Sequence, residues 1–394
     1  MHRCWFVLVA AWLLAGAAVG QEKPKGLGVV VEGRSLASWL KALSGKDEKQ
    51  QEKASEVLTK AGKSLVPNLI VGLKNSDADL REQSAQVLGL LGEDAADAVP
   101  ALIDSLGDKA PAVRGAAASA LGDIGPSARE AVKPLIGLLK DQDEAVREQA
   151  AHGLGGIGPD AKEAVDPLIA LLKGKAEGLQ EAAADALGGI GPDAVKAGPT
   201  LLGVFKKAKD AELKASLLRS LGGIGYKEKD GISALTRGLA DKQEEVREAA
   251  AGALGKLGSD AKTAVKALIG AMKDKSEDVR TAVAEALGEI GEDAKEAVPA
   301  LTEALKDMSA DVRAAAATSL GNMGKAAEPS VAALAEALKD TSEEVRDNAL
   351  DALGMLGPVA KEAIPAIKAL IEKSDDESVR DAAAEVLKKI EGKQ

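Results

Sequence analysis

The sequence has 394 residues, a formal net charge of −11 and 46% hydrophobic residues, with one cysteine, two histidines and 2% aromatic residues. This acidic balance argues against nucleic acid as a partner, because phosphate binding requires a basic face. So few cysteines and histidines argue against a zinc site and against nucleophilic catalysis by a Cys–His pair.

The first twenty residues have the pattern of a secretory signal peptide. His2 and Arg3 precede an apolar run from Trp5 to Val19, and a polar stretch begins at Gln21. The run is shorter than the roughly 20 residues that a membrane-spanning helix needs, so a retained anchor is the weaker alternative. We therefore expect residues 1–20 to be cleaved and the protein to be exported to the periplasm or the extracellular space, with no membrane span after cleavage.

Two segments precede the repetitive part of the chain. Residues 21–34 are predicted to be a flexible leader. Residues 35–62 resemble a degenerate helix pair, in which Trp39 and Leu43 cover the core of the next unit. A stack of helix pairs needs such a cap, because its terminal unit would otherwise expose an apolar side. A use of Trp39 as a lone ligand platform is the weaker alternative.

Residues 63–391 contain ten copies of a repeat of about 33 residues, and residues 392–394 form a tail. Each copy carries an apolar marker residue, followed by Arg in most copies. The spacing is 33, and it becomes 34 at the steps that end at Leu213 and Val379. The markers are Leu80, Val113, Val146, Leu179, Leu213, Val246, Val279, Val312, Val345 and Val379.

Each repeat is predicted to contain two helices. In the second helix of one repeat, Val146, Ala150, Leu154 and Ile157 fall on one stripe of a helix with 3.6 residues per turn. An Asp or Ser three residues before the marker can cap the start, and a glycine such as Gly158 can adopt the left-handed conformation at the end. One pair cannot bury its stripe alone, so the sequence predicts an all-α solenoid, or superhelix, of about eleven two-helix repeats.

These repeats resemble HEAT repeats, in particular the HEAT-like repeats first named in phycobilisome lyases, with the pattern D-x-x-x-x-V-R-x-x-A-A-x-A-L-G-x-I-G. The resemblance covers about Ser35 to Glu391. It implies a ladder between successive repeats, made by an Asp in the turn inside each repeat and an Arg six residues later. Asn75/Arg81 and Ser374/Arg380 match in part. The full matches are Asp108/Arg114, Asp141/Arg147, Asp241/Arg247, Asp274/Arg280, Asp307/Arg313 and Asp340/Arg346.

Two adjacent repeats depart from the ladder pattern. They carry Gly174/Gln180 and Ala208/Lys214, and one of the longer spacings falls between them. We interpret this region as drift, with Phe205 filling core space. A local change of curvature, or a hinge, between about residues 168 and 230 is the alternative.

Enzymatic HEAT-like families fit this chain poorly. Deoxyhypusine hydroxylase, which the repeats resemble, binds iron through His-Glu pairs, and this sequence contains none. Phycobilin lyases act inside the cell, which does not suit an exported chain. The glycine-rich segments close helices and do not follow strands, so they are not phosphate-binding loops. His152 is expected to face solvent. We therefore predict no catalytic residues, no cofactor and no metal, and an enzyme such as a lyase or hydroxylase is the least favoured alternative.

One helix face is a candidate binding surface. We expect the second helices to line the concave side, as in HEAT relatives. Their exposed residues then lie one, five and nine positions after the residue that follows the marker, which is Arg in most copies. These positions are rich in acids. Part of that excess follows from the helix dipole, which favours carboxylates in the first turn. The candidate partner-binding residues are Glu148, Glu181, Asp185, Glu248, Glu285, Glu289, Asp347 and Asp351.

The sequence thus predicts a non-enzymatic protein-binding scaffold outside the cytoplasm. Its partner would be another protein, with a basic segment as a possible ligand held by many weak, salt-sensitive contacts. A structural spacer or envelope component with no specific ligand is the alternative. The partner's identity, the biological process and the oligomeric state are left open.

Overall fold

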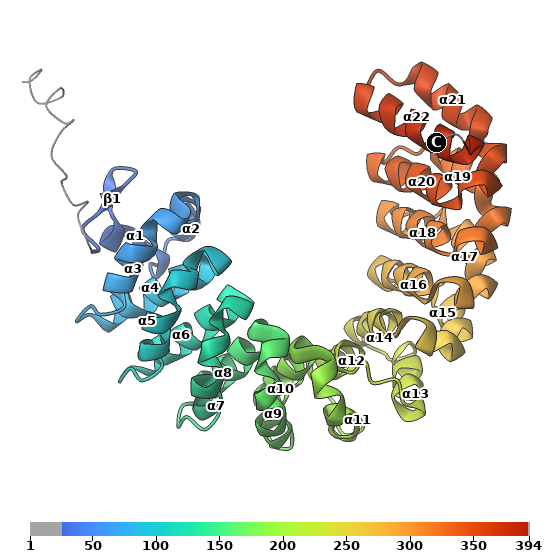
Figure 1. Cartoon of the computed structure of the whole chain (residues 1–394). Coiled ribbons are helices and arrows are strands. Elements are labelled where there is room, and N and C mark those ends of the chain that lie inside the picture. Colours follow the sequence, from blue (N-terminus) through green and yellow to red (C-terminus); the bar gives the residue numbers. More distant parts are fainter. Residues whose placement is uncertain (1–25, 393–394) are drawn as a thin grey trace, which may run out of the picture. The chain divides into compact units, whose positions relative to one another are not determined.

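The structure is a computed structural model, and it describes residues 26–392. The predicted signal peptide and the first part of the predicted leader lie outside the described residues. The described residues divide into two compact units, 26–120 and 121–392. Figure 1 labels their helices and strands. The boundary falls within one helix, α6 (Pro111–Ile124).

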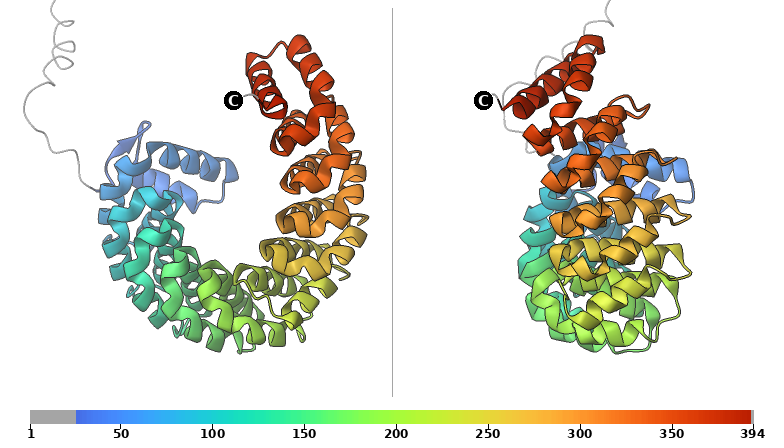
Figure 2. Two further views of the ribbon diagram at one scale, coloured as in Figure 1. Left: turned by 45° about the vertical axis from the view of Figure 1, so that its right-hand side comes forward. Right: turned by 90° about the vertical axis from the view of Figure 1, so that its right-hand side faces the viewer.

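Helix pairs follow one another along the described chain (Figure 2), and the predicted all-α solenoid of two-helix repeats is confirmed. The first helices of the pairs are α1 Leu36–Leu43, α3 Val66–Gly72, α5 Val99–Ser105, α7 Val132–Leu138, α9 Val165–Leu172, α11 Gly198–Phe205, α13 Lys229–Gly238, α15 Val265–Ala271, α17 Val298–Ala304, α19 Val331–Ala337 and α21 Ile364–Lys373. The second helices are α2 Glu48–Ala61, α4 Ala78–Leu90, α6, α8 Glu144–Ile157, α10 Glu177–Ile190, α12 Ala211–Gly223, α14 Glu244–Lys256, α16 Glu277–Ile290, α18 Ala310–Asn322, α20 Glu343–Leu356 and α22 Glu377–Glu391.

Short 3-10 helices, which the sequence analysis did not predict, connect most repeats. They are η1 Gly62–Leu65, η2 Gly92–Ala98, η3 Gly125–Ala131, η4 Gly158–Ala164, η5 Gly191–Ala197, η6 Gly258–Ala264, η7 Gly291–Ala297, η8 Gly324–Ser330 and η9 Gly357–Ala363. Each starts at a glycine with positive φ; Gly158, for example, has φ 77° and ψ −141°. Its ψ differs from that of the expected left-handed conformation. Glycine is still favoured at this position, because a Cβ would clash at such a φ.

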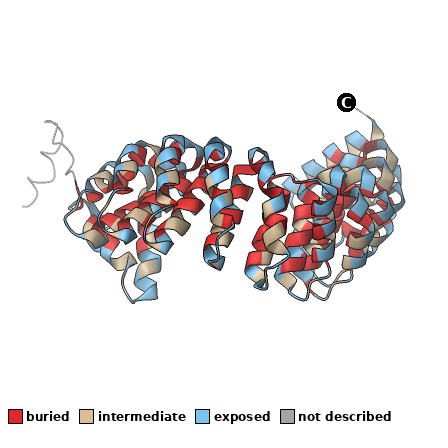
Figure 3. Cartoon of the chain, turned by 90° about the horizontal axis from the view of Figure 1, so that it is seen from below, coloured by how far each residue is buried: buried red, intermediate tan, exposed pale blue. Residues whose placement is uncertain are grey.

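The core of each unit lies between helices, and buried residues follow the helix sides that face a neighbour (Figure 3). Val146, Ala150, Leu154 and Ile157 are each at most 1% exposed, so the predicted stripe is the buried one. In the second unit, neighbouring second helices contact one another extensively, whereas neighbouring first helices touch at few residues. The second helices therefore form the more closely packed layer of this unit.

Glycine makes this close packing possible. A Cβ added to Gly155 on α8 would lie 2.8 Å from the Cα of Ala186 on α10, and one added to Gly222 on α12 would lie 2.7 Å from the Cα of Ala253 on α14. Because backbone meets backbone at these positions, a larger residue could fit only if the helices moved apart.

The end of the predicted leader is ordered, and our expectation of a flexible segment up to residue 34 was wrong for residues 26–34. Strands β1 (Val30–Val31) and β2 (Arg34–Ser35) form an antiparallel hairpin. The Trp39 indole Nε1 donates a hydrogen bond of 2.7 Å to the carbonyl oxygen of Val31, and the Arg34 guanidinium lies 4.9 Å from the centre of the Trp39 ring. Strands of two residues are too short to show an alternating pattern in the sequence.

The cap itself packs as a helix pair. Trp39 is 2% exposed, Leu43 is half-buried, and α1 contacts α4 of the next repeat. Trp39 is thus a buried anchor for the hairpin and the cap, which leaves its ring little surface for a ligand.

Candidate functional site

The eight acidic candidates lie on five second helices of the second unit, and we call the surface that they mark the acidic face. Glu148 and Glu181 are half-buried and the other six are exposed. The acids come from α8, α10, α14, α16 and α20. Helices α12 and α18 interrupt the series, because their corresponding positions carry no acid: these are Ala215, Arg219 and Gly223 on α12 and its C-terminal end, and Ala314, Thr318 and Asn322 on α18.

Three groups of these acids interact electrostatically. Burial raises the pKa of Glu285 above its ordinary value, and the carboxylates of Glu289 and Glu248 raise it further. Burial likewise raises the pKa of Glu181, with Asp185 as the next cause. Burial is the largest cause in both cases, and at Glu181 the opposing effect of the nearby Arg219 does not outweigh burial and the neighbouring acids.

The third group lies on α20. Burial raises the pKa of Asp347, and the nearby carboxylates of Glu343 and Asp351 raise it further, while Arg346 opposes them. A positively charged ligand would relieve this repulsion.

The acidic face is hollowed between its helices. A cleft of about 550 Å³ between α8 and α10 is lined by Glu148, His152, Glu181 and Asp185, with glycines beneath them. His152 is exposed, as expected. A Cβ added to Gly178 would lie 2.6 Å from a carboxylate oxygen of Glu148, so the glycine provides the room in which this acid lies.

A second cleft of about 600 Å³ crosses α16, α18 and α20. It is lined by the predicted Glu285 and Glu289 and also by Asp311 and Glu344, which the sequence analysis missed. Both missed acids lie two positions before the Arg that follows the marker residue. This is about one helical turn before the first position of the predicted face, which is one residue after that Arg. Extending the helical spacing by one turn toward the N-terminus would have found them.

One predicted acid already has a partner within the protein. The hydroxyl of Ser216 on α12 donates a hydrogen bond to the carboxylate of Asp185 on α10. Asp185 therefore helps to join two repeats, and it is the candidate with the clearest structural role.

The ladder joins successive repeats through residues 27 positions apart. Arg247 Nε lies 2.6 Å from Asp274 Oδ2, and Arg247 Nη2 lies 2.8 Å from Asp274 Oδ1. The same arginine donates from Nη1 to the carbonyl oxygen of Asp241, six residues earlier. Each such arginine thus bonds to the backbone in its own repeat and to the carboxylate in the next. The described side-chain pairs are Arg81–Asp108, Lys214–Asp241, Arg247–Asp274, Arg280–Asp307 and Arg313–Asp340.

Asp108 and Arg114, six residues apart in one repeat, take part in the ladder in different ways. Arg114 Nη1 donates a hydrogen bond of 2.8 Å to the backbone carbonyl oxygen of Asp108. The Asp108 carboxylate accepts instead from Arg81 Nε of the preceding repeat at 2.7 Å, and from the backbone N–H of Ala110. A separation of six residues therefore places Arg114 against the backbone of the turn, while the carboxylate of the same turn reaches back to the earlier repeat.

Lys214 corrects one sequence-based expectation. We expected its repeat to lack the ladder, yet Lys214 Nζ lies 3.0 Å from Asp241 Oδ2. Lysine offers a single point charge, whereas arginine makes a two-pronged contact. Lysine can still take the place of arginine in the ion pair, because its side chain also reaches the next repeat.

The ladder is interrupted where the residue 27 positions onward is not an acid. Arg147 has Gly174 at that position, and its Nη2 instead pairs with Glu144 at 3.1 Å. Arg346 has Lys373 at that position, and its Nη1 donates to a backbone carbonyl oxygen six residues earlier at 2.8 Å. Both arginines thus keep a contact within their own repeat.

Gln180 interrupts the ladder in a different way. Its residue 27 positions onward is Lys207, and its amide donates to the carbonyl oxygens of Leu172 and Gly174. The repeat that follows has one extra residue before its marker. Because of this extra residue, the residue 27 positions after Gln180 is Lys207, whereas the residue six positions before Lys214 is Ala208.

The connection after α12 also differs from its neighbours. No 3-10 helix separates α12 from α13 within the described chain, and Tyr226 occupies this turn. The Tyr226 side chain is 8% exposed and packs against Gly198 and Gly231, where an added Cβ would collide with its ring. Phe205, which we expected to fill core space, is only half-buried.

Among residues 26–392, no helix is long and apolar enough to span a membrane. The same residues contain no group of three or more His, Cys, Asp or Glu side chains that could hold a metal ion.

Comparison with solved structures shows a likeness in fold. Importin beta matches with a TM-score of 0.56 and 13% identity, over 90% of this chain and 57% of the other. A mutant of Kap121p matches with a TM-score of 0.53 and 12% identity, over 90% and 45%. A structure that describes Kap95p binding to RanGDP matches with a TM-score of 0.52 and 16% identity, over 90% and 55%. The chain spans about half the length of these proteins.

Sequence comparison gives the family. A search of curated proteins found no match. The family model for HEAT repeats matches residues 36–122, 66–155, 99–188, 132–222, 198–264, 260–320 and 298–388, which together cover most of the chain. Repeats of this family typically mediate protein binding and are usually non-catalytic. This protein belongs to the HEAT-repeat family.

Proposed function

We propose that this protein is a non-enzymatic scaffold that binds a basic segment of another protein along its acidic face. The observation that carries the proposal is the clustering of acids on that face: burial, and after it neighbouring carboxylates, raise the pKa values of Glu181, Glu285 and Asp347. A lysine- or arginine-rich segment would lower this electrostatic energy on binding, and it would find clefts between the helices for its side chains.

We further propose that the scaffold works outside the cytoplasm. The support is the sequence pattern of residues 1–20, with His2 and Arg3 before an apolar run. A fusion of these residues to a reporter that is active only after export tests this part. A reporter that stays in the cytoplasm would contradict it.

Charge reversal tests the acidic face. We expect a labelled lysine-rich peptide to bind the full chain, and binding to weaken as salt increases, because exposed charges are screened. The combined variant Glu285→Lys, Glu289→Lys, Asp347→Lys and Asp351→Lys should weaken binding at least tenfold, since four attractive contacts become repulsive.

The matched control reverses the same number of charges away from the face. Glu163, Glu296, Glu328 and Glu362 are exposed acids on the 3-10 helices, and their change to Lys makes the same change in net charge. An equal loss of binding in both variants would show that only net charge matters. Isolation of the native complex gives the second test, and a chain that captures no stoichiometric partner would favour a structural spacer.

A further inference from the structure

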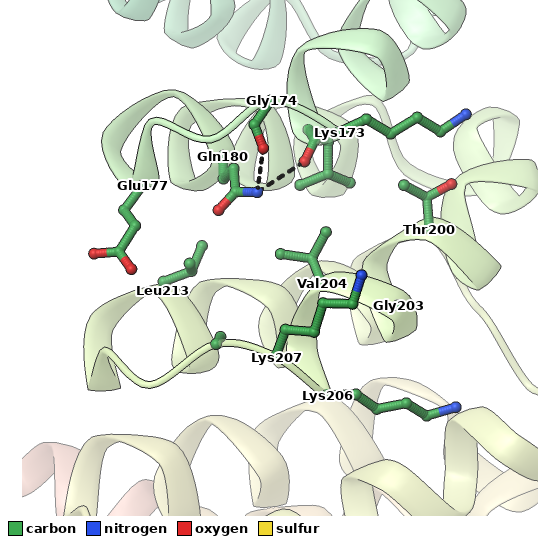
Figure 4. A pocket seen from close by; sticks show the side chains of 12 residues that line it. Lys173, Gly174, Glu177, Gln180, Thr200, Gly203, Val204, Lys206, Lys207 and Leu213 are labelled. Atoms are coloured by element: carbon green, nitrogen blue, oxygen red, sulfur yellow. Dashed lines mark hydrogen bonds between the residues drawn. The ribbon is translucent and has the colours of Figure 1, made fainter.

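A cleft of different character lies where the ladder is interrupted, between the repeat of α9 and α10 and the repeat of α11 and α12 (Figure 4). Its volume is about 560 Å³. The half-buried Val204 gives it an apolar wall, with Leu172 and Leu213 buried behind the surface, and Lys173, Lys206 and Lys207 also line it. The volume is in the range of ordinary ligand sites, roughly 300–1,000 Å³.

The missing ladder pair accounts for the open space. In the regular repeats an arginine crosses to an aspartate 27 residues onward, as Arg280 does to Asp307 at 2.7 Å. Here Gln180 stands in the arginine's place and Lys207 in the aspartate's. The Gln180 amide turns back to the carbonyl oxygens of Leu172 and Gly174, and it is too short to reach the next repeat (Figure 4).

The same change leaves the lysines without their usual neighbouring acid. In regular repeats the lysine at the end of the first helix directly precedes the ladder aspartate, as in Lys140–Asp141, Lys273–Asp274 and Lys306–Asp307. Lys173 instead precedes Gly174, and Lys206 precedes Lys207. None of the three lysines of the cleft has an ion-pair partner among residues 26–392. Glu177 lies at the opposite end of the cleft from Lys173 (Figure 4).

We propose that this cleft binds an acidic segment of another protein. An apolar side chain of the segment would lie against Val204, and flanking carboxylates would meet Lys173, Lys206 and Lys207. Charge complementarity supports this occupant, because three lysines without an ion-pair partner among the described residues line the cleft against a single acid, Glu177, in a chain whose net charge is −11. The site is distinct from the acidic face in its charge, so its test does not depend on the function proposed above.

Binding of a labelled peptide made of glutamates around two leucines tests the proposal with the full chain. Changing Lys173, Lys206 and Lys207 to Gln should weaken binding by about tenfold, since three exposed ion pairs are lost. The matched control changes Lys140, Lys273 and Lys306 to Gln, which removes the same charge beside intact ladder aspartates. That control should bind the peptide like the parent chain.

A second variant fills the cleft without removing Lys173 or Lys206. Gln180→Arg with Lys207→Asp rebuilds the ladder pair at its normal separation of 27 residues, and it should abolish peptide binding while the circular dichroism spectrum stays unchanged. If that variant loses its helical signal, the proposal is tested by comparing the lysine-to-glutamine variant of the cleft with its matched control.

Four outcomes would overturn the proposal. These are no binding to the parent chain, an equal loss in the control, unchanged binding after the ladder pair is rebuilt in a folded protein, and inorganic phosphate that displaces the peptide at equal concentration. A fifth outcome would also overturn the proposal. If the lysine-to-glutamine variant sediments as a smaller species than the parent chain, the occupant of the cleft is a second copy of this chain.

Discussion

Arg247 and Asp274 join two neighbouring repeats through a two-pronged contact, with nitrogen–oxygen distances of 2.6 and 2.8 Å. Their side chains are only 7% and 13% exposed, so the pair is shielded from solvent. Hydrogen bonding from Arg247 holds the pKa of Asp274 below its usual range. A contact of this kind fixes the separation of the two repeats as well as their orientation.

Removing one partner should therefore be costly. Asp274→Ala leaves Arg247 without a carboxylate, and we expect a loss of about 1.5–3 kcal/mol in the free energy of unfolding, as for other hydrogen bonds to charged groups. Native-state hydrogen exchange of the α14 and α16 amides measures the loss locally. Asp166→Ala is the control, because Asp166 pairs with Lys196 at 2.7 Å but both side chains are more than half exposed. The control should cost well under about 1 kcal/mol, and an equal cost for both would contradict a structural role for the ladder.

The acidic face and the ladder should respond to pH in opposite ways. The pKa of Asp274 is lowered from 3.8, so its stabilisation is complete above pH 3.8 and is lost as the pH falls through the folded-state value. The pKa of Glu285 is raised from 4.5, so its ionisation destabilises the fold, and the penalty disappears as the pH falls to 4.5.

Glu285→Gln should therefore raise the thermal midpoint at pH 7 and have little effect below pH 4.5. Asp274→Asn should lower the midpoint at pH 7, and its effect should shrink as the pH falls below 3.8. Midpoints measured across this pH range compare the two variants with the parent chain. An advantage of Glu285→Gln that persists at low pH would show that repulsion is not its cause.

A core leucine reports on the buried stripe. Leu254 on α14 is fully buried, and Leu254→Ala should cost about 2–5 kcal/mol because it leaves a cavity. Leu90 on α4 also lies on a second helix but is 50% exposed, so Leu90→Ala should cost far less. Chemical denaturation measures both. A loss well under about 1 kcal/mol for Leu254→Ala would contradict its place in the core.

Two helix glycines should respond to alanine with opposite signs. Gly155→Ala places a Cβ 2.8 Å from the Cα of Ala186, so we expect a loss of about 1–3 kcal/mol from overpacking. Gly252 on α14 has open space around its Cβ direction, and Gly252→Ala should stabilise the protein by about 0.4–1 kcal/mol. Thermal midpoints of the two variants test the pair. Equal shifts would show that helix propensity, rather than close packing, decides the response.

Much of this architecture was predictable because it is local and repeated. The stripe of Val146, Ala150, Leu154 and Ile157 follows from helical periodicity, and all four residues are buried. The hairpin of β1 and β2 was missed, because its two-residue strands depend on packing against Trp39 rather than on any pattern of their own. The acids Asp311 and Glu344 were missed because the predicted face began one helical turn too late.

The ladder shows which features the sequence determined and which depended on the tertiary structure. By itself, the sequence determined which residues face the core, where each helix ends and how often the unit recurs, since these depend on periodicity and on glycine's freedom at positive φ. Only the tertiary structure decided that Lys214 reaches Asp241 and that Gln180 leaves a cleft beside Lys207. Such contacts join residues about one repeat apart, and they depend on how closely neighbouring helix pairs pack, which no single repeat specifies.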